Sequence, residues 1–126
     1  MNPSLDDPRR ALERWQRLAP GIRLAYNPQQ PAVIRQYLGL GHRLVQCGVL
    51  APEWAWPKML NLLLQTAHDE ALPWFWRSVC LEYSTMPLVR ASHHLRRRGD
   101  LAVPARLQAR VGAALVALGA TPGTAA

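Results

Sequence analysis

The stretch Pro73–Gly99, PWFWRSVCLEYSTMPLVRASHHLRRRG, joins a strongly apolar half to the densest positive charge in the chain. In its first half, apolar side chains recur at the i, i+3, i+4, i+7 spacing of one helix face: Trp76, Val79, Cys80 and Tyr83. Trp74 and Leu81 lie on the opposite face, and a helix that is apolar on two sides is usually packed between other helices. We therefore predict a central, buried helix over residues 73–84.

The second half of this stretch predicts a basic helix over residues 87–98. Pro87 suits the first turn of a helix, and Gly99 suits the left-handed residue that often follows the last turn. The polar face and the last turn carry Arg90, His93, His94, Arg96, Arg97 and Arg98. A buried helix followed closely by a basic one is compatible with a helix-turn-helix pair, although the turn lacks the glycine that is frequent in this motif.

The rest of the chain also predicts helices. Prolines stand at or near six helix starts: Pro8, Pro31, Pro57, Pro73, Pro87 and Pro104. The fold class that follows is all-α, a compact single domain of about five to six short helices. We expect this domain to span residues 8–119, with a flexible lead at 1–7 and a frayed tail at 120–126.

Three connections between these helices are suggested by the prolines and glycines of the sequence. Pro20-Gly21 is expected to end the first helix, so residues 22–26 form an extended connector. Residues 51–57 are expected to form a turn before the helix that Pro57 opens. Residues 101–103 suit one short strand. The helical pattern after it argues against the wing of a winged-helix protein, so no family is assigned.

Length and composition favour one soluble globular domain. At 126 residues and 49% hydrophobic content, the chain is long enough to bury a core and too apolar for a disordered protein. The N-terminus lacks a signal-peptide pattern and no apolar run is long enough to span a membrane, so we predict a cytoplasmic protein without a membrane partner. Cys47 and Cys80 fall on predicted apolar faces and are expected to be buried free thiols.

The net charge of +7 favours an anionic partner, namely nucleic acid, an acidic protein or a membrane surface. Of the 15 basic residues all but Lys58 are arginine, whose guanidinium fork suits phosphate. However, a chain rich in arginine, alanine and proline is also typical of a GC-rich bacterial genome. The arginine content is therefore weak support for phosphate recognition on its own.

The sequence contains no recognisable catalytic or metal-binding motif. The four histidines, at 42, 68, 93 and 94, do not form the His-x-x-x-His spacing of a zinc site, and the two cysteines are far apart in sequence. No serine stands in a Gly-x-Ser-x-Gly nucleophile motif. We predict that the protein is not an enzyme and has no cofactor or metal.

Two glycines interrupt the helix that ends before Gly48. Gly39 and Gly41 each cost about 1 kcal/mol of helix stability relative to alanine. Two explanations remain open: another helix crosses closely at this point, or the helix kinks.

The five tryptophans are numerous for a small domain, and some are expected to be partly exposed. Trp15 and Trp76 fall on core faces. The candidates for exposure, and so for a protein interface, are Trp54, Trp56 and Trp74.

Two functional hypotheses follow. The first is a small nucleic-acid-binding or regulatory protein, in which phosphates contact the basic helix through Arg90, His93, His94, Arg96, Arg97 and Arg98, helped by Arg9, Arg10, Arg14 and Arg17. The second is an adaptor, inhibitor or assembly subunit that binds another protein, or a second copy of itself, through the exposed tryptophans. Whether the two arginine groups lie close together is not determined by the sequence.

Overall fold

The computed structural model describes residues 7–119, so the predicted lead, apart from Asp7, and the predicted tail lie outside it. The helices are α2 (Pro8–Arg23), α3 (Ala32–Gln46), α4 (Pro52–His68), α5 (Trp74–Tyr83), α6 (Thr85–Arg97) and α7 (Ala102–Gly119). No strand occurs among the described residues. The prediction of an all-α fold with five to six helices is confirmed.

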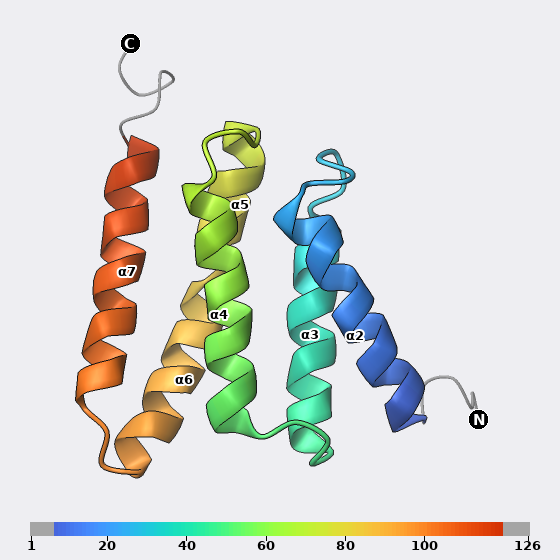
Figure 1. The fold of residues 1–126 in the computed structure, drawn as a ribbon, viewed down its shortest axis with the longest axis vertical. Coiled ribbons are helices and arrows are strands. Elements are labelled where there is room, and N and C mark those ends of the chain that lie inside the picture. The colour runs from blue at the N-terminus through green and yellow to red at the C-terminus, as the bar shows by residue number, and fades with distance from the viewer. Residues whose placement is uncertain (1–6, 120–126) are drawn as a thin grey trace.

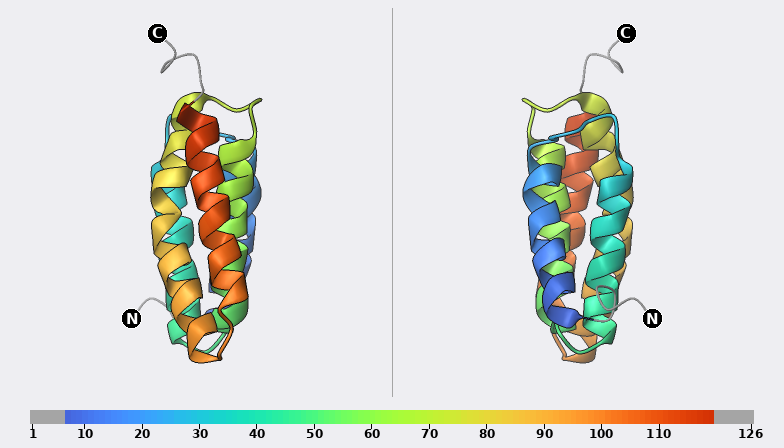
Figure 2. Two further views of the ribbon diagram at one scale, coloured as in Figure 1. Left: turned by 90° about the vertical axis from the view of Figure 1, so that its left-hand side faces the viewer. Right: turned by 90° about the vertical axis from the view of Figure 1, so that its right-hand side faces the viewer.

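The helices lie side by side along one long axis (Figures 1 and 2). Their direction alternates from α2 to α3, α4 and α5, whereas α6 continues in the direction of α5 and α7 returns antiparallel to them (Figure 1). α4 is the helix that contacts all the others, from α2 to α7. The central position that we predicted for residues 73–84 therefore belongs to α4.

α4 is central because its apolar residues face several directions. Its buried residues are Ala55, Trp56, Met59, Leu60, Leu63, Leu64, Thr66 and Ala67.

Two buried hydrogen bonds connect α5 to the helices around it. The Trp76 indole N–H donates to the Ile22 carbonyl at 2.9 Å, and Arg77 Nε donates to the Ala67 carbonyl at 2.8 Å. Trp15 and Trp76 are buried core residues, as predicted.

Gly41 marks a close crossing of three helices. A Cβ built on Gly41 would lie 2.8 Å from Trp15 Nε1, and nearer still to the Met59 sulfur. The Trp15 indole N–H is buried here with no hydrogen-bond partner among the described residues. Gly39 has open space around it, so a close crossing explains only one of the two glycines.

The first helix is longer than we predicted. α2 continues through Pro20 and Gly21 to Arg23, so the extended connector at 22–26 is wrong. Ile22 is fully buried and its carbonyl accepts the Trp76 hydrogen bond. Tertiary packing of this last turn therefore outweighs the helix-breaking tendency of proline and glycine.

The start of α4 also differs from the prediction. The helix begins at Pro52, which takes the first helical position, and Pro57 lies inside it. The predicted turn over residues 51–57 is therefore wrong. Ala55 and Trp56 are both buried, and only the helical conformation places them on the side of α4 that faces the core.

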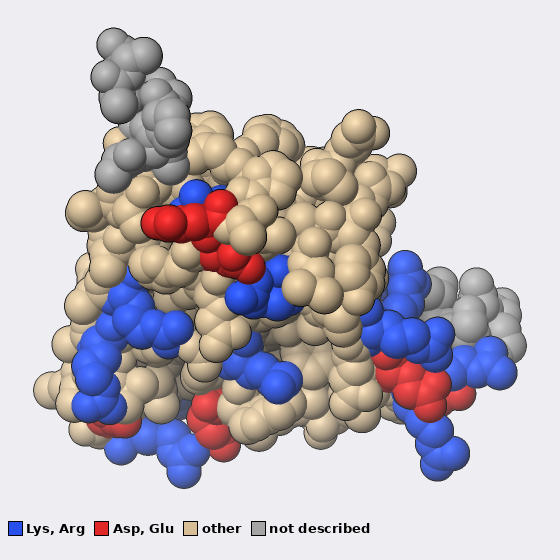
Figure 3. All heavy atoms as spheres, turned by 45° about the horizontal axis from the view of Figure 1, so that its top comes forward, with Lys and Arg blue, Asp and Glu red and all other residues tan. Residues whose placement is uncertain are grey.

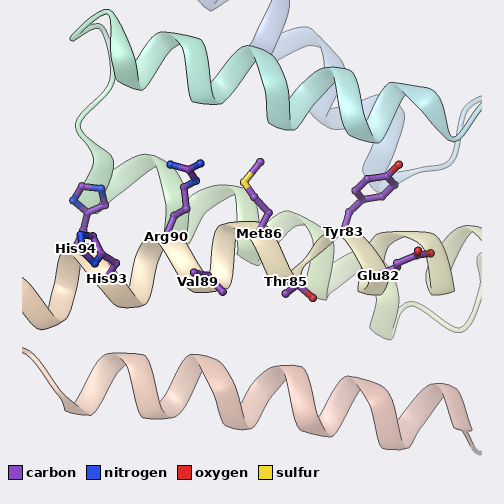
Figure 4. A pocket seen from close by; sticks show the side chains of 8 residues that line it. All are labelled: Glu82, Tyr83, Thr85, Met86, Val89, Arg90, His93 and His94. Carbon is purple, nitrogen blue, oxygen red and sulfur yellow. The ribbon is translucent and has the colours of Figure 1, made fainter.

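The predicted helix-turn-helix pair is not present. Ser84 alone separates α5 from α6, and the two helices follow one another along almost the same line (Figures 1 and 4). A helix-turn-helix needs a crossing near a right angle, about 90–120°. The buried Ser84 hydroxyl donates to the Leu81 carbonyl at 2.5 Å, which satisfies the hydroxyl at the junction.

The short strand suggested at 101–103 is replaced by the start of α7. Asp100 Oδ1 accepts hydrogen bonds from the backbone N–H groups of Ala102 and Val103, both at 3.1 Å. This is the N-cap interaction that satisfies the unpaired donors of a first turn. Gly99 has the predicted left-handed conformation, with φ of 83°.

The two cysteines differ in their surroundings. Cys80 is buried as predicted, whereas Cys47 is exposed, which corrects the prediction for that residue. Cys47 is the residue at which α3 ends, and it lies beyond the apolar face that packs into the core. Within residues 7–119, no helix combines the length and the apolar character needed to cross a membrane.

Candidate functional site

The two predicted arginine groups lie at the same end of the bundle, on either side of α3. α2 begins, and α3 and α6 end, at the lower end of Figure 1. In Figure 1, α2 lies to the right of α3, and α6 lies to its left, beyond α4. The end of the molecule that is brought forward in Figure 3 is mostly uncharged, and the Lys and Arg atoms lie mainly in the lower half of that view.

The α2 group meets α3 in a surface groove. Arg14 and Arg43 line the same cavity of about 290 Å³, together with Gln36 and Gly39. Arg10 and Arg17 share the helical face of Arg14, because they are spaced four and three residues from it. Arg9 does not share this face, so the structure brings together only part of the predicted α2 group.

Arg43 is a residue that we did not identify from the sequence. Its position beside Arg14 follows from the packing of α3 against α2 and could not be derived from the sequence. The helical spacing of Gln36, Gly39 and Arg43 on α3 was the available signal, since residues three or four apart share one face.

The α6 group lines a larger groove of about 560 Å³ beside α5 and α6. The lining residues are Glu82, Tyr83, Thr85, Met86, Val89, Arg90, His93 and His94. Figure 4 shows Tyr83, Met86, Arg90 and His94 on the side of these helices that is turned toward α3. Arg97 follows Arg90 and His94 on the same face at helical spacing and is exposed.

Arg90 connects this groove to α3 and α4. Its guanidinium lies over the Trp56 ring, 5.4 Å from the ring centroid, and the His42 ring lies 5.7 Å from the same tryptophan. Burial and the nearby Arg90 charge both lower the pKa of His42. His42 Nδ1 is covered and has no hydrogen-bond partner in the part of the chain that the structure describes. The neutral form of His42 is therefore favoured.

Ion pairs neutralise some of the predicted cations but not others. Arg98 pairs with Glu53 at 3.1 Å, Arg17 with Glu13 at 3.5 Å, and Arg10 with Asp7 at 3.7 Å. No ion pair to a described acidic residue is formed by Arg14, Arg43, Arg90, Arg96 or Arg97. These exposed guanidinium groups are available to an anionic partner.

We define the basic face as the basic residues that line or flank these two grooves, together with His42. It comprises Arg10, Arg14, Arg17, His42, Arg43, Arg90, His93, His94 and Arg97. The remaining predicted cations, Arg9, Arg96 and Arg98, lie beside this face at the same end of the bundle.

No protein-family model, curated protein or solved structure matches this chain. Any function must therefore be argued from the chemistry of its own residues.

The three predicted interface tryptophans do not form one patch. Trp54 is 49% exposed and Trp74 is 47% exposed, as predicted, but Trp56 is only 1% exposed. Trp54 and Trp56 both lie on α4, where two residues correspond to a rotation of about 200°, so one points outward and the other into the core. Trp54 lines a pocket against α2, and Trp74 lines another against α7.

A groove with a mostly apolar lining lies between α5 and α7. Trp74 lies in it, and its indole N–H donates to the Leu118 carbonyl at 3.3 Å. Leu115 lines this groove and is exposed, and Phe75 and Val116, which follow Trp74 and Leu115 in sequence, are exposed as well. The exposure of Leu115 was not predicted, because Leu115 fits the same helical pattern as the buried residues Ala114 and Leu118.

The described residues contain no group of three or more histidine, cysteine, aspartate or glutamate side chains that could hold a metal ion. Burial raises the pKa of the Cys80 thiol to about 12, so this cysteine is not activated as a nucleophile.

Proposed function

We propose that this protein binds nucleic acid through the basic face. The observation that carries the proposal is the arrangement around α3: arginines of α2 lie on one side and arginines of α6 on the other. Arg43 and His42, which are consecutive on α3, lie next to one group each. A phosphate backbone crossing α3 would therefore meet guanidinium groups along its whole path.

The chemistry of this face favours contacts to phosphate over contacts to bases. Its cations are arginines on solvent-exposed helical surfaces, which suit phosphate oxygens. The basic helix α6 does not have the geometry of the second helix of a helix-turn-helix, because α5 and α6 run end to end and α6 does not stand apart as a separate element. We therefore expect binding that depends strongly on salt and little on base sequence.

The test is a titration of fluorescent DNA and RNA, single- and double-stranded, over a series of salt concentrations. Arg14→Ala and Arg43→Ala should each weaken binding to all sequences. Each should also reduce the slope of log affinity against log salt by up to about 0.9 for duplex DNA, the value for one lost phosphate contact.

Arg9→Ala is the matched control, because it removes the same charge from the same helix but lies off the basic face. Equal weakening by Arg9→Ala and Arg14→Ala would mean that net charge, and not this face, attracts the nucleic acid. Absence of binding by the native protein at low salt would reject the proposal outright.

A second candidate function is binding to another protein through the groove between α5 and α7. The observation in its favour is that Trp74 and Leu115 are both exposed and line the same groove. Aromatic residues of this kind often anchor protein interfaces. Trp54 lies elsewhere, so the interface of this second proposal contains Trp74 alone of the three predicted tryptophans.

Light scattering and pull-down experiments test this second candidate. If the groove is an interface, Trp74→Ala and Leu115→Asp should abolish self-association or the capture of a partner that the native protein retains. Trp54→Ala should leave both unchanged. A molecular mass and a set of partners that are unchanged in Trp74→Ala and Leu115→Asp would contradict it.

A further inference from the structure

A pocket between α2 and α4 is not part of the basic face. Its volume is about 440 Å³, which falls within the range of small-molecule sites, about 300–1,000 Å³. It shares no lining residue with the basic face. The residues that line it are Trp15, Gln16, Ala19, Pro20, Arg23, Tyr37, Trp54, Lys58 and Leu62.

Three aromatic rings form the walls of this pocket. The Trp15 and Tyr37 rings are stacked, with centroids 5.4 Å apart and planes inclined by only 4°. Trp54 meets Trp15 edge-on, at 6.1 Å and 60°. Trp15 and Tyr37 are each only 1% exposed, so they close the pocket toward the core, whereas Trp54 is half exposed and offers its ring to a ligand. Such walls favour a flat aromatic ring, which packs against other rings face to face or edge to face.

The uncompensated charge at the pocket is positive. Lys58 Nζ lies 5.1 Å from the centroid of the Trp54 ring and forms no ion pair with an acidic residue in residues 7–119. Arg23 also lines the pocket, but its Nη1 is 2.7 Å from Asp69 Oδ2, which compensates its charge. A ligand with one negative charge would therefore complement Lys58.

We propose that this pocket binds a small planar aromatic carboxylate, of the size of an aryl or indolyl acid. The aromatic ring packs against the exposed Trp54 ring, and the carboxylate forms an ion pair with the Lys58 ammonium. Gln16 lines the same pocket and offers an amide that can donate to the second carboxylate oxygen. Neutral and cationic analogues of the same ring lack the partner for Lys58 and bind more weakly.

Isothermal titration calorimetry with indole-3-acetate as the probe tests the proposal. Indole-3-acetamide, which is neutral and nearly isosteric, and tryptamine, which is cationic, serve as comparisons. We expect saturable binding of indole-3-acetate, with the acetamide bound about tenfold or more weakly, a difference typical of one partly desolvated charged contact. Absence of saturable binding at millimolar concentrations, or equal affinity for all three probes, would overturn the proposal.

Variants assign the binding to this pocket. Lys58→Gln should lower the affinity for indole-3-acetate about tenfold and leave the affinity for indole-3-acetamide unchanged. Trp54→Ala should weaken both probes. Trp74→Ala removes an equally exposed tryptophan from another groove and should weaken neither. Circular dichroism checks that each variant is folded, and a Lys58→Gln protein that binds the acid as well as the native protein contradicts the assignment.

The outcome is independent of the proposed nucleic-acid binding. Arg14→Ala, which should weaken nucleic-acid binding, faces α3 and not this pocket, so it should leave the affinity for indole-3-acetate unchanged. Loss of aromatic-acid binding in this variant would indicate general damage to α2 and would count against a separate site.

Discussion

At the scale of single residues, the two glycines of α3 give opposite expectations. Gly41→Ala places a methyl group against Trp15 and Met59, so we expect overpacking to lower the free energy of unfolding by about 1–3 kcal/mol. Gly39→Ala meets no atom within 4 Å and should raise it by up to about 1 kcal/mol through helix propensity. Urea denaturation measures both, and a Gly41→Ala protein as stable as the native one would contradict the close crossing.

His42 should make stability depend on pH. Burial and the Arg90 charge lower its pKa, so the unfolded chain binds a proton more readily than the folded protein does. The free energy of unfolding should therefore fall as the pH drops below the ordinary histidine value of 6.5, and recover above it.

Thermal unfolding at pH 7.5 and pH 5 measures this dependence. His42→Gln should reduce the loss of melting temperature on acidification, and Arg90→Gln should reduce it in part by removing one of the two causes. A loss that is the same in the native protein and in His42→Gln would show that other groups carry it.

At the scale of elements, N-capping of α7 by Asp100 should make a measurable contribution to the free energy of unfolding. Asp100→Ala removes the acceptor for two backbone N–H groups, and we expect a loss of about 1 kcal/mol in the free energy of unfolding. Asp100→Asn keeps an acceptor oxygen and should retain most of the stability. Chemical denaturation of the three proteins tests this, and an alanine variant of native stability would mean that packing alone fixes the start of the helix.

The helices could be predicted from the sequence better than their ends. Apolar periodicity and prolines near the first turns indicated six helices, and six are present in the described residues. The errors at Pro20, Pro57 and residues 101–103 have one cause. At Pro20 and Pro57, the local signal for a helix break was outweighed by the burial of Ile22 and Trp56. At residues 101–103, the Asp100 cap begins a helix where the local pattern suggested a strand. Burial and capping both depend on contacts that a pattern in the sequence does not contain.

The helix-turn-helix prediction failed for a related reason. Sequence spacing located two helical segments and the boundary between them, but it did not give the angle at which they meet. With Ser84 as the single residue between α5 and α6, the chain has too little length to reverse or cross itself.

At the scale of the whole molecule, the candidate site was predictable only in pieces. The sequence indicated the arginines of the first helix and of the basic helix, but their common position depends on the antiparallel arrangement of α2 and α6, which both pack against α4. Arg43 and His42 became part of the face for the same reason. Trp56 was lost from the predicted interface because the start of α4 rotates it into the core.

The crowding of arginines at one end should affect the stability of the whole protein. Like charges at the end where α2 begins and α6 ends repel one another more in the folded protein than in the expanded chain. We expect the melting temperature to rise from low to moderate sodium chloride concentration as this repulsion is screened. A melting temperature that falls over this range would mean that the four ion pairs between described residues outweigh the repulsion.

Because only one of the two cysteines is exposed, the protein has a natural attachment point for a spectroscopic label. Cys80 is buried and its pKa is raised to about 12, whereas Cys47 is open to solvent. A maleimide dye should therefore react once per folded molecule without any engineered cysteine. Because Cys47 ends α3, the dye would sit four residues along the chain from Arg43, where its emission can report directly on what approaches the basic face.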